Sequence, residues 1–163
     1  MPLPLHLLIH FGLALLTGYL AGRYFKKLEM GIVAGFIGGF LIDFDHVLEY
    51  LITFGPQFSL QYFLEGRQFL ITDQIHLWFH AWEYIIVLII LARIFRTKQI
   101  LAAFLITLAF ASGIHLLTDS IINNYPLKYY SLSYRQELGF SAQKLLSPAE
   151  YQKNQKIKKE LGI

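Results

Sequence analysis

Cysteine is absent from the 163 residues of this chain. Disulfide bonds and metal sites built from thiolates are therefore excluded. Any metal ion that the protein binds must be held by histidine, aspartate or glutamate side chains. Six histidines and eleven acidic residues are available for this role.

Charged residues are scarce as well, because they make up 15% of the chain while hydrophobic residues make up 55%. A soluble domain of this length is usually more polar, so a lipid bilayer is the expected solvent. The net charge is only +3, and the basic residues do not form a dense stripe. Both features argue against a nucleic-acid partner. The first five residues also lack the basic start of a secretory signal, so we expect the first apolar segment to be retained.

The apolar segments predict an all-α, polytopic membrane protein with a bundle of four main helices. The expected helices cover about residues 5–22, 30–54, 76–95 and 99–122. Gly55-Pro56 ends the second helix, and the mixed aromatic and polar segment 55–75 is typical of a membrane interface. Ser147-Pro148-Ala149-Glu150 has the spacing of a capping box and predicts a short basic surface helix. We therefore expect a membrane domain over 1–122 and an aromatic, basic tail over 123–163.

Two basic clusters mark one end of the expected helices, and the histidines and aspartates mark the other. The clusters are Arg23/Lys26/Lys27 and Arg93/Arg96/Lys98. Along each helix, 16 or 17 residues separate a cluster from the polar residue near the far end, namely His6, Asp43, His80 or His115. At about 1.5 Å per residue the separation is roughly 24 to 26 Å in every helix. Antiparallel helices would thus bring these side chains to one layer, which predicts a metal site.

Spacing within the polar clusters also suits metal ligation, because residues three or four apart share a helix face. The pairs are His6 with His10, Asp43 with His46, His76 with His80, and His115 with Asp119. Asp45 would point away from Asp43 on an ideal helix. Both carboxylates can bind one centre only if the helix ends or unwinds there; otherwise Asp45 supports a ligand or pairs with Glu49.

At these positions the chain resembles the membrane-bound metal-dependent hydrolases, bacterial inner-membrane proteins that include a LexA-regulated member. The resemblance covers most of residues 1–135. It rests on an early histidine at His6 or His10, on Asp43-Phe44-Asp45-His46, on His76 with His80, and on His115 to Asp119. It implies a metal site and hydrolase activity.

Imidazole and carboxylate ligands without sulfur favour one or two zinc ions, with manganese or iron as alternatives. The leading hypothesis is hydrolysis by a metal-activated water, with Asp45 as a bridging ligand or the base. The expected substrate is a lipid or lipid-linked phosphoester or ester, because the site would lie near the membrane surface. Arg67, Lys128 and Arg135 are candidates for binding an anionic head group.

The competing hypothesis is a non-enzymatic membrane protein with a structural metal site, or a sensor or carrier. A protein-filled coordination shell would favour a structural role, and an open position holding water would favour catalysis. The basic loops favour a bacterial or archaeal cytoplasmic membrane with the metal layer near the outer face. The sequence leaves the oligomeric state open.

Overall fold

The computed structural model describes residues 3–163 and divides the chain into two compact units that interleave along the sequence. The first unit comprises residues up to Asp43 together with Phe79–Tyr130, and the second comprises Phe44–Trp78 together with Ser131–Ile163. The described residues form helices and no β-strand, apart from one isolated bridge between Gln74 and Ser141. The predicted all-α class is therefore confirmed.

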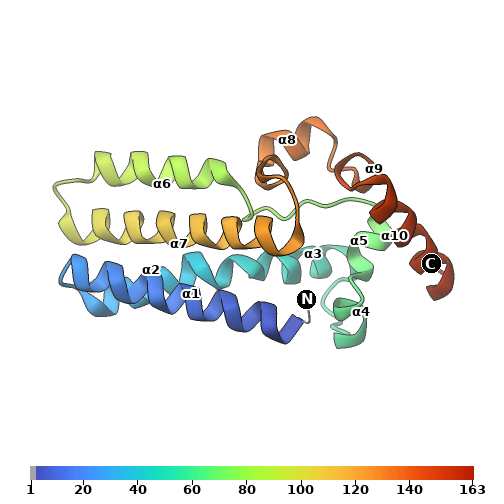
Figure 1. Cartoon of the computed structure of the whole chain (residues 1–163), viewed down its shortest axis with the longest axis horizontal. Coiled ribbons are helices and arrows are strands. Elements are labelled where there is room, and N and C mark those ends of the chain that lie inside the picture. The colour runs from blue at the N-terminus through green and yellow to red at the C-terminus, as the bar shows by residue number, and fades with distance from the viewer. Residues whose placement is uncertain (1–2) are drawn as a thin grey trace. The chain divides into compact units, whose positions relative to one another are not determined.

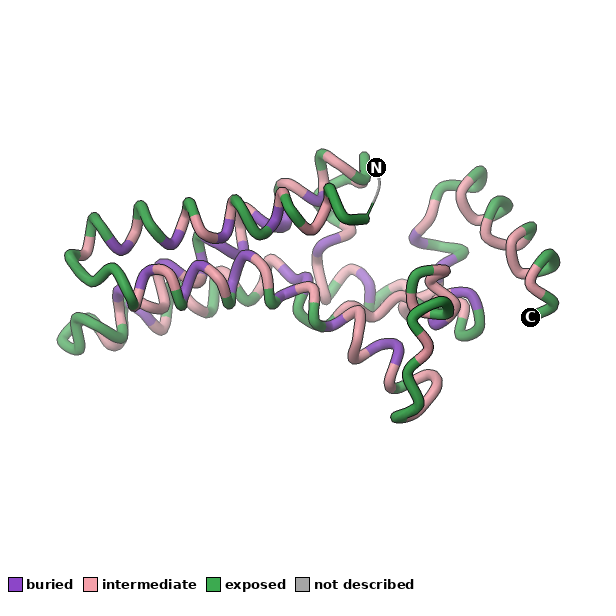
Figure 2. Tube along the Cα trace, turned by 90° about the horizontal axis from the view of Figure 1, so that it is seen from below, coloured by how far each residue is buried: buried purple, intermediate pink, exposed green. Residues whose placement is uncertain are grey.

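The first unit is built from four helices that lie side by side (Figure 1). They are α1 (Leu3–Tyr24), α2 (Leu28–Gly39), α6 (Trp82–Ile94) and α7 (Gln99–Asn123), with two short 3-10 helices, η1 (Leu41–Asp43) and η2 (Leu127–Tyr130). Helix α7 packs against each of the other three, and α1 packs against α2. Figure 2 shows exposed residues along the outer sides of these helices, and many of them are large and apolar.

Three helical segments are long and apolar enough to cross a membrane. They are Leu3–Tyr24, Leu28–Phe54 and Gln99–Asn123. Helix α6 has 13 residues, which span about 20 Å and fall short of a hydrocarbon core of about 30 Å. The lengths and composition are thus consistent with a membrane protein.

The second predicted helix, 30–54, is interrupted. Helix α2 ends at Gly39, Phe40 leaves the helical conformation with φ −131°, and η1 follows before α3 (Phe44–Phe54) begins. The prediction of one continuous helix was wrong at this point, because glycines weaken a helix locally. The unwinding that a shared role for Asp43 and Asp45 would require is present.

The third predicted helix, 76–95, begins only at Trp82. Residues 73–81 are not helical, and Leu77 has a positive φ of 44°. At the start of this segment the backbone pairs instead with the C-terminal part of the second unit. The N–H of Ile75 donates to the carbonyl of Phe140, and the N–H of Ala142 donates to the carbonyl of Asp73, each at 2.9 Å. The prediction that His76 and His80 share a helix face was therefore wrong.

The second unit contains α3 and five further helices. These are α4 (Leu60–Leu64), α5 (Arg67–Thr72), α8 (Leu132–Glu137), α9 (Ala142–Leu145) and α10 (Pro148–Leu161). Buried Tyr50 packs among the rings of Phe54, Phe58 and Phe63, and its hydroxyl accepts a hydrogen bond from the N–H of Ser59. Helix α10 begins with the predicted capping box. Its Tyr151 hydroxyl donates to Asp73 at 2.9 Å, and this hydrogen bond raises the pKa of Tyr151.

Glycines let α1 and α2 approach closely. An added Cβ at Gly35 would lie 2.5 Å from Cα of Gly18, so no side chain fits between the two backbones. At Gly12, on the same α1 helix, an added Cβ would meet no atom within 4 Å. Close approach of small residues is a principal source of helix association in lipid.

We expect Gly35→Ala to lower the thermal stability of the detergent-purified protein, although alanine favours an isolated helix by about 1 kcal/mol relative to glycine. The reason is that the new methyl group pushes α1 away from α2. Gly12→Ala is the matched control and should leave the melting temperature unchanged or raise it slightly. Equal melting temperatures for Gly35→Ala and Gly12→Ala would contradict the packing described here.

Candidate metal centre

Six polar side chains of the first unit come together at one end of its long helices. His6 and His10 come from the first turns of α1, Asp43 from η1, His80 from the segment before α6, and His115 and Asp119 from α7. They form two overlapping groups of potential ligands. The first group is Asp43, His80, His115 and Asp119, and the second is His6, His10 and Asp43.

The first group places four donor atoms around one point. The Nε2 atoms of His80 and His115 are 3.1 Å apart. Oδ1 of Asp43 lies 3.4 Å from both nitrogens, and Oδ2 of Asp119 lies 3.3 Å from both. A tetrahedral zinc ion with ligand distances of about 2.0–2.2 Å has its ligand atoms about 3.3–3.6 Å apart. The spacing of the four donors therefore fits one ion of this kind.

The protonation of His115 also fits metal ligation. Its Nδ1 is 3.1 Å from the carbonyl oxygen of Gly39, and a carbonyl only accepts hydrogen bonds, so Nδ1 carries the proton. In the neutral ring the Nε2 lone pair then faces the other three donors. Metal-binding histidines are commonly oriented by a hydrogen bond of this type from the other ring nitrogen. The Gly39 carbonyl therefore supports the ligand role of His115.

Asp119 connects the first group to the two histidines of α1. Its second oxygen, Oδ1, lies 3.0 Å from Nε2 of His10 and 3.4 Å from Nε2 of His6. Oδ2 of Asp43 is buried and has no hydrogen-bond partner. A carboxylate with one oxygen already in the first group and an unpaired second oxygen can bridge two ions. The donor set therefore has room for a second ion held by His6, His10 and the two aspartates.

The second position is less completely supported than the first. Nδ1 of His10 is buried and has no hydrogen-bond partner, whereas Nδ1 of His115 has one. The second position also lies nearer to solvent, because the side chains of His6 and Asp43 are 18% and 17% exposed. Those of His80, His115 and Asp119 are at most 5% exposed. Water or a substrate would therefore reach the centre from the side of His6 and Asp43.

The interruption after α2 places two of the functional groups. Because the helix ends at Gly39, no later residue of the helix donates an N–H to the Gly39 carbonyl. This carbonyl is therefore free to accept a hydrogen bond from His115. The tighter turn of η1 then presents Asp43, whose N–H donates to the carbonyl of Phe40 at 3.3 Å. Sequence reasoning missed the role of the Gly39 carbonyl, because a backbone acceptor leaves no side-chain signal.

Three further predicted ligands belong to the second unit. Asp45 is buried in the first turn of α3, and the ring of His46 packs edge-on against Phe69. His76 places its Nδ1 2.6 Å from Oε1 of the buried Glu49, and its ring stacks on Trp78. The ligand roles of Asp45, His46 and His76 stay predictions.

The predicted substrate-binding cations are found in different surroundings. Arg67 contacts the carboxylate of Glu65 and the ring of Tyr62, and its hydrogen bond lowers the pKa of Glu65. Arg135 is buried, and its Nη2 donates to the carbonyl of Leu77 at 2.9 Å. Lys128, in η2, lies beside the ring of Tyr129. Arg67 and Arg135 thus already hold part of the second unit together, and substrate binding by these three residues stays a prediction.

Comparisons of the chain with protein-family profiles, with curated proteins and with solved structures find no match. The geometry of the donor atoms is accordingly the basis for a function.

Proposed function

We propose that the protein is a membrane-embedded, metal-dependent hydrolase of lipid or lipid-linked phosphoesters, related to the membrane-bound metal-dependent hydrolases that it resembles. The observation that carries the proposal is the convergence of four donor atoms from three distant parts of the chain, because the two imidazole nitrogens are 3.1 Å apart and each lies 3.3–3.4 Å from both carboxylate oxygens. Buried carboxylates and imidazoles at such depth are expensive without a shared cation, and they mark function in membrane proteins.

Within this proposal, Asp43, His80, His115 and Asp119 hold a first ion, and His6 and His10 with the second oxygens of the two aspartates hold another. Zinc suits these ligands best, with manganese or iron as alternatives. Such ions acidify a bound water and stabilise negative charge on an attacked phosphoryl group. Asp45, as predicted from the sequence, would serve as a bridging ligand or as the base.

The chain's own residues favour a lipid substrate. His6 lies in the first turns of a helix that is apolar and 22 residues long, so the more exposed edge of the centre lies near the end of a candidate membrane span. A substrate arriving from the bilayer surface would meet His6 and Asp43 first. The proposed architecture is a four-helix membrane bundle, with α6 as the shorter fourth helix, in a bacterial or archaeal cytoplasmic membrane. The centre would face outward if the basic loops are cytoplasmic.

Asp43→Ala is expected to abolish hydrolysis, because Asp43 belongs to both ligand groups. Purified protein loaded with zinc would be assayed on bis-p-nitrophenyl phosphate and on phosphatidic acid in detergent micelles. Ser112→Ala is the control, since Ser112 is a buried residue of α7 outside both groups and its loss should leave turnover unchanged. Turnover by Asp43→Ala at the wild-type rate would refute the assignment.

A structural metal site is the second candidate, and one observation favours it. The first group supplies four protein donors, which fill a tetrahedral shell and leave no position for water. In a purely structural protein the first ion would be bound tightly and no phosphoester would be cleaved. Metal-loaded wild-type protein without turnover on any phosphoester tested would therefore favour this second function over the hydrolase.

A further inference from the structure

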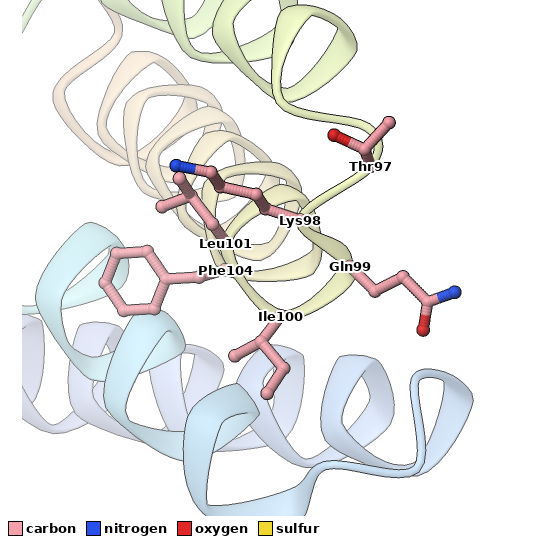
Figure 3. Close-up of a pocket in the computed structure, with 6 residues that line it drawn as sticks. All are labelled: Thr97, Lys98, Gln99, Ile100, Leu101 and Phe104. Atoms are coloured by element: carbon pink, nitrogen blue, oxygen red, sulfur yellow. The ribbon is translucent and has the colours of Figure 1, made fainter.

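The end of the first unit opposite the metal centre carries a cavity of about 360 Å³. It lies where the turn between α1 and α2 meets the turn between α6 and α7. Its lining residues are Phe25, Lys27, Arg96, Gln99, Ile100, Ala102, Ala103 and Ile106. It adjoins a second, more open pocket of about 650 Å³, and Figure 3 shows the residues that line this second pocket, which are Thr97, Lys98 and residues of the first turns of α7. Volumes of this size are typical of small-ligand pockets.

The charged residues that line both cavities are all basic. Lys27 comes from one turn, and Arg96 and Lys98 come from the other. No ion pair joins these three residues to a carboxylate in residues 3–163. Glu29, in the first turn of α2, does not line either cavity. The rim of the cavity is therefore complementary to an anion.

The walls below this rim are apolar. Ile100, Ala102 and Ile106 come from the first turns of α7, and Phe25 closes the side formed by the α1–α2 turn. Both α1 and α7 are candidate membrane spans, so the basic rim lies at the end of apolar helices. A phospholipid matches this arrangement, because its charged headgroup phosphate would lie at the basic rim and its acyl chains would lie against the apolar walls.

We propose that this cavity binds an anionic phospholipid, with Lys27 and Arg96 contacting the headgroup phosphate and Ile100 and Ile106 contacting an acyl chain. Basic pockets between membrane helices are a common means of recognising anionic lipids. The bound lipid tethers the two turns to each other across the cavity. The site is independent of the metal centre, because the 12 residues of α2, which span roughly 18 Å, lie between Lys27 and η1 with Asp43.

The test measures the melting temperature of the full-length protein in detergent with increasing short-chain phosphatidylglycerol. Phosphatidylcholine with the same acyl chains is the lipid control. Phosphatidylglycerol should raise the melting temperature and phosphatidylcholine should not. The double variant Lys27→Gln/Arg96→Gln should weaken the apparent affinity about 30-fold, because each lost cation contributes about fivefold.

Arg23→Gln/Arg93→Gln is the matched control variant. It removes the same charge from the same two helix ends, but neither residue lines the cavity. Ala102→Phe fills the cavity without changing charge and should weaken binding as well. This variant tests the site if the double variant fails to fold. Equal losses in the test and control variants would overturn the site in favour of diffuse attraction. The same stabilisation by inorganic phosphate alone would overturn the lipid assignment.

Discussion

Asp119→Ala is expected to remove essentially all bound metal from the purified protein. Oδ2 of Asp119 lies 3.3 Å from the Nε2 atoms of His80 and His115, while Oδ1 lies 3.0 Å from Nε2 of His10. One substitution therefore removes a donor from each proposed ion. It also removes the negatively charged carboxylate that lies next to the histidine rings and would balance the charge of a bound cation. Truncating one partner of a buried charged cluster is generally costly, so metal affinity should fall steeply.

Metal content per protein, measured by mass spectrometry of the elements after detergent purification, checks this expectation. His6→Ala removes a donor only from the second position, so we expect it to keep the first ion. His115→Ala should lose the first ion, and Ser112→Ala, one turn earlier on α7, should keep the wild-type content. Metal bound by Asp119→Ala at the wild-type stoichiometry would contradict the bridging role of this carboxylate.

The sequence predicted the convergence of ligands because the rise per residue of a helix is constant, so the distance between two residues along a helix follows from their sequence separation. His6, Asp43 and His115 each lie 16 or 17 residues from a basic helix end, and the structure brings them to one layer. Neighbouring helices joined by short turns, as α1 and α2 are, place equal distances along each helix at equal depth. The apolar character of the helices predicted their existence in the same way, and the capping box predicted the start of α10.

The irregular segments could not be predicted from periodicity. Gly38 and Gly39 weaken the helix locally, but the apolar pattern continues through Phe40, so the sequence indicates neither where α2 ends nor that the Gly39 carbonyl is left open. The residues before Trp82 also fit a helical pattern, but their backbone bonds to Phe140 and to Ala142, which lie more than sixty residues away in the chain. In this second segment, tertiary hydrogen bonds therefore override local helix preference.

The geometry also separates residues that the sequence treats alike. His76 and His80 are four residues apart, but His80 belongs to the first ligand group, whereas His76 is held by Glu49 in the second unit. The feature that decides this difference is the non-helical backbone between them, with a positive φ at Leu77 and a turn at Trp78-Phe79, so the two side chains do not share a helical face. Of these two histidines, only His80 belongs to a ligand group of the first unit.

Removing the metal is expected to lower the melting temperature of the wild-type protein by about 5 to 15 °C. An ion present at a hundred to a thousand times its dissociation constant stabilises a folded chain by about 3 to 4 kcal/mol, and each kcal/mol shifts the midpoint by about 2 to 4 °C at this size. Chelator should produce the shift and added zinc should reverse it. Ser112→Ala should respond as the wild type does.

The physical reason for this expectation lies in the four donors of the first group. With Nδ1 of His115 donating to Gly39, its Nε2 lone pair faces the other imidazole nitrogen at 3.1 Å and two carboxylate oxygens at 3.3 and 3.4 Å. Without a cation the cluster must take up a proton or open, and either change loosens the contact of α7 with η1. His115→Ala should therefore melt at a lower temperature and respond little to chelator. A chelated wild type that has lost its metal but melts unchanged would show that these donors do not share an ion.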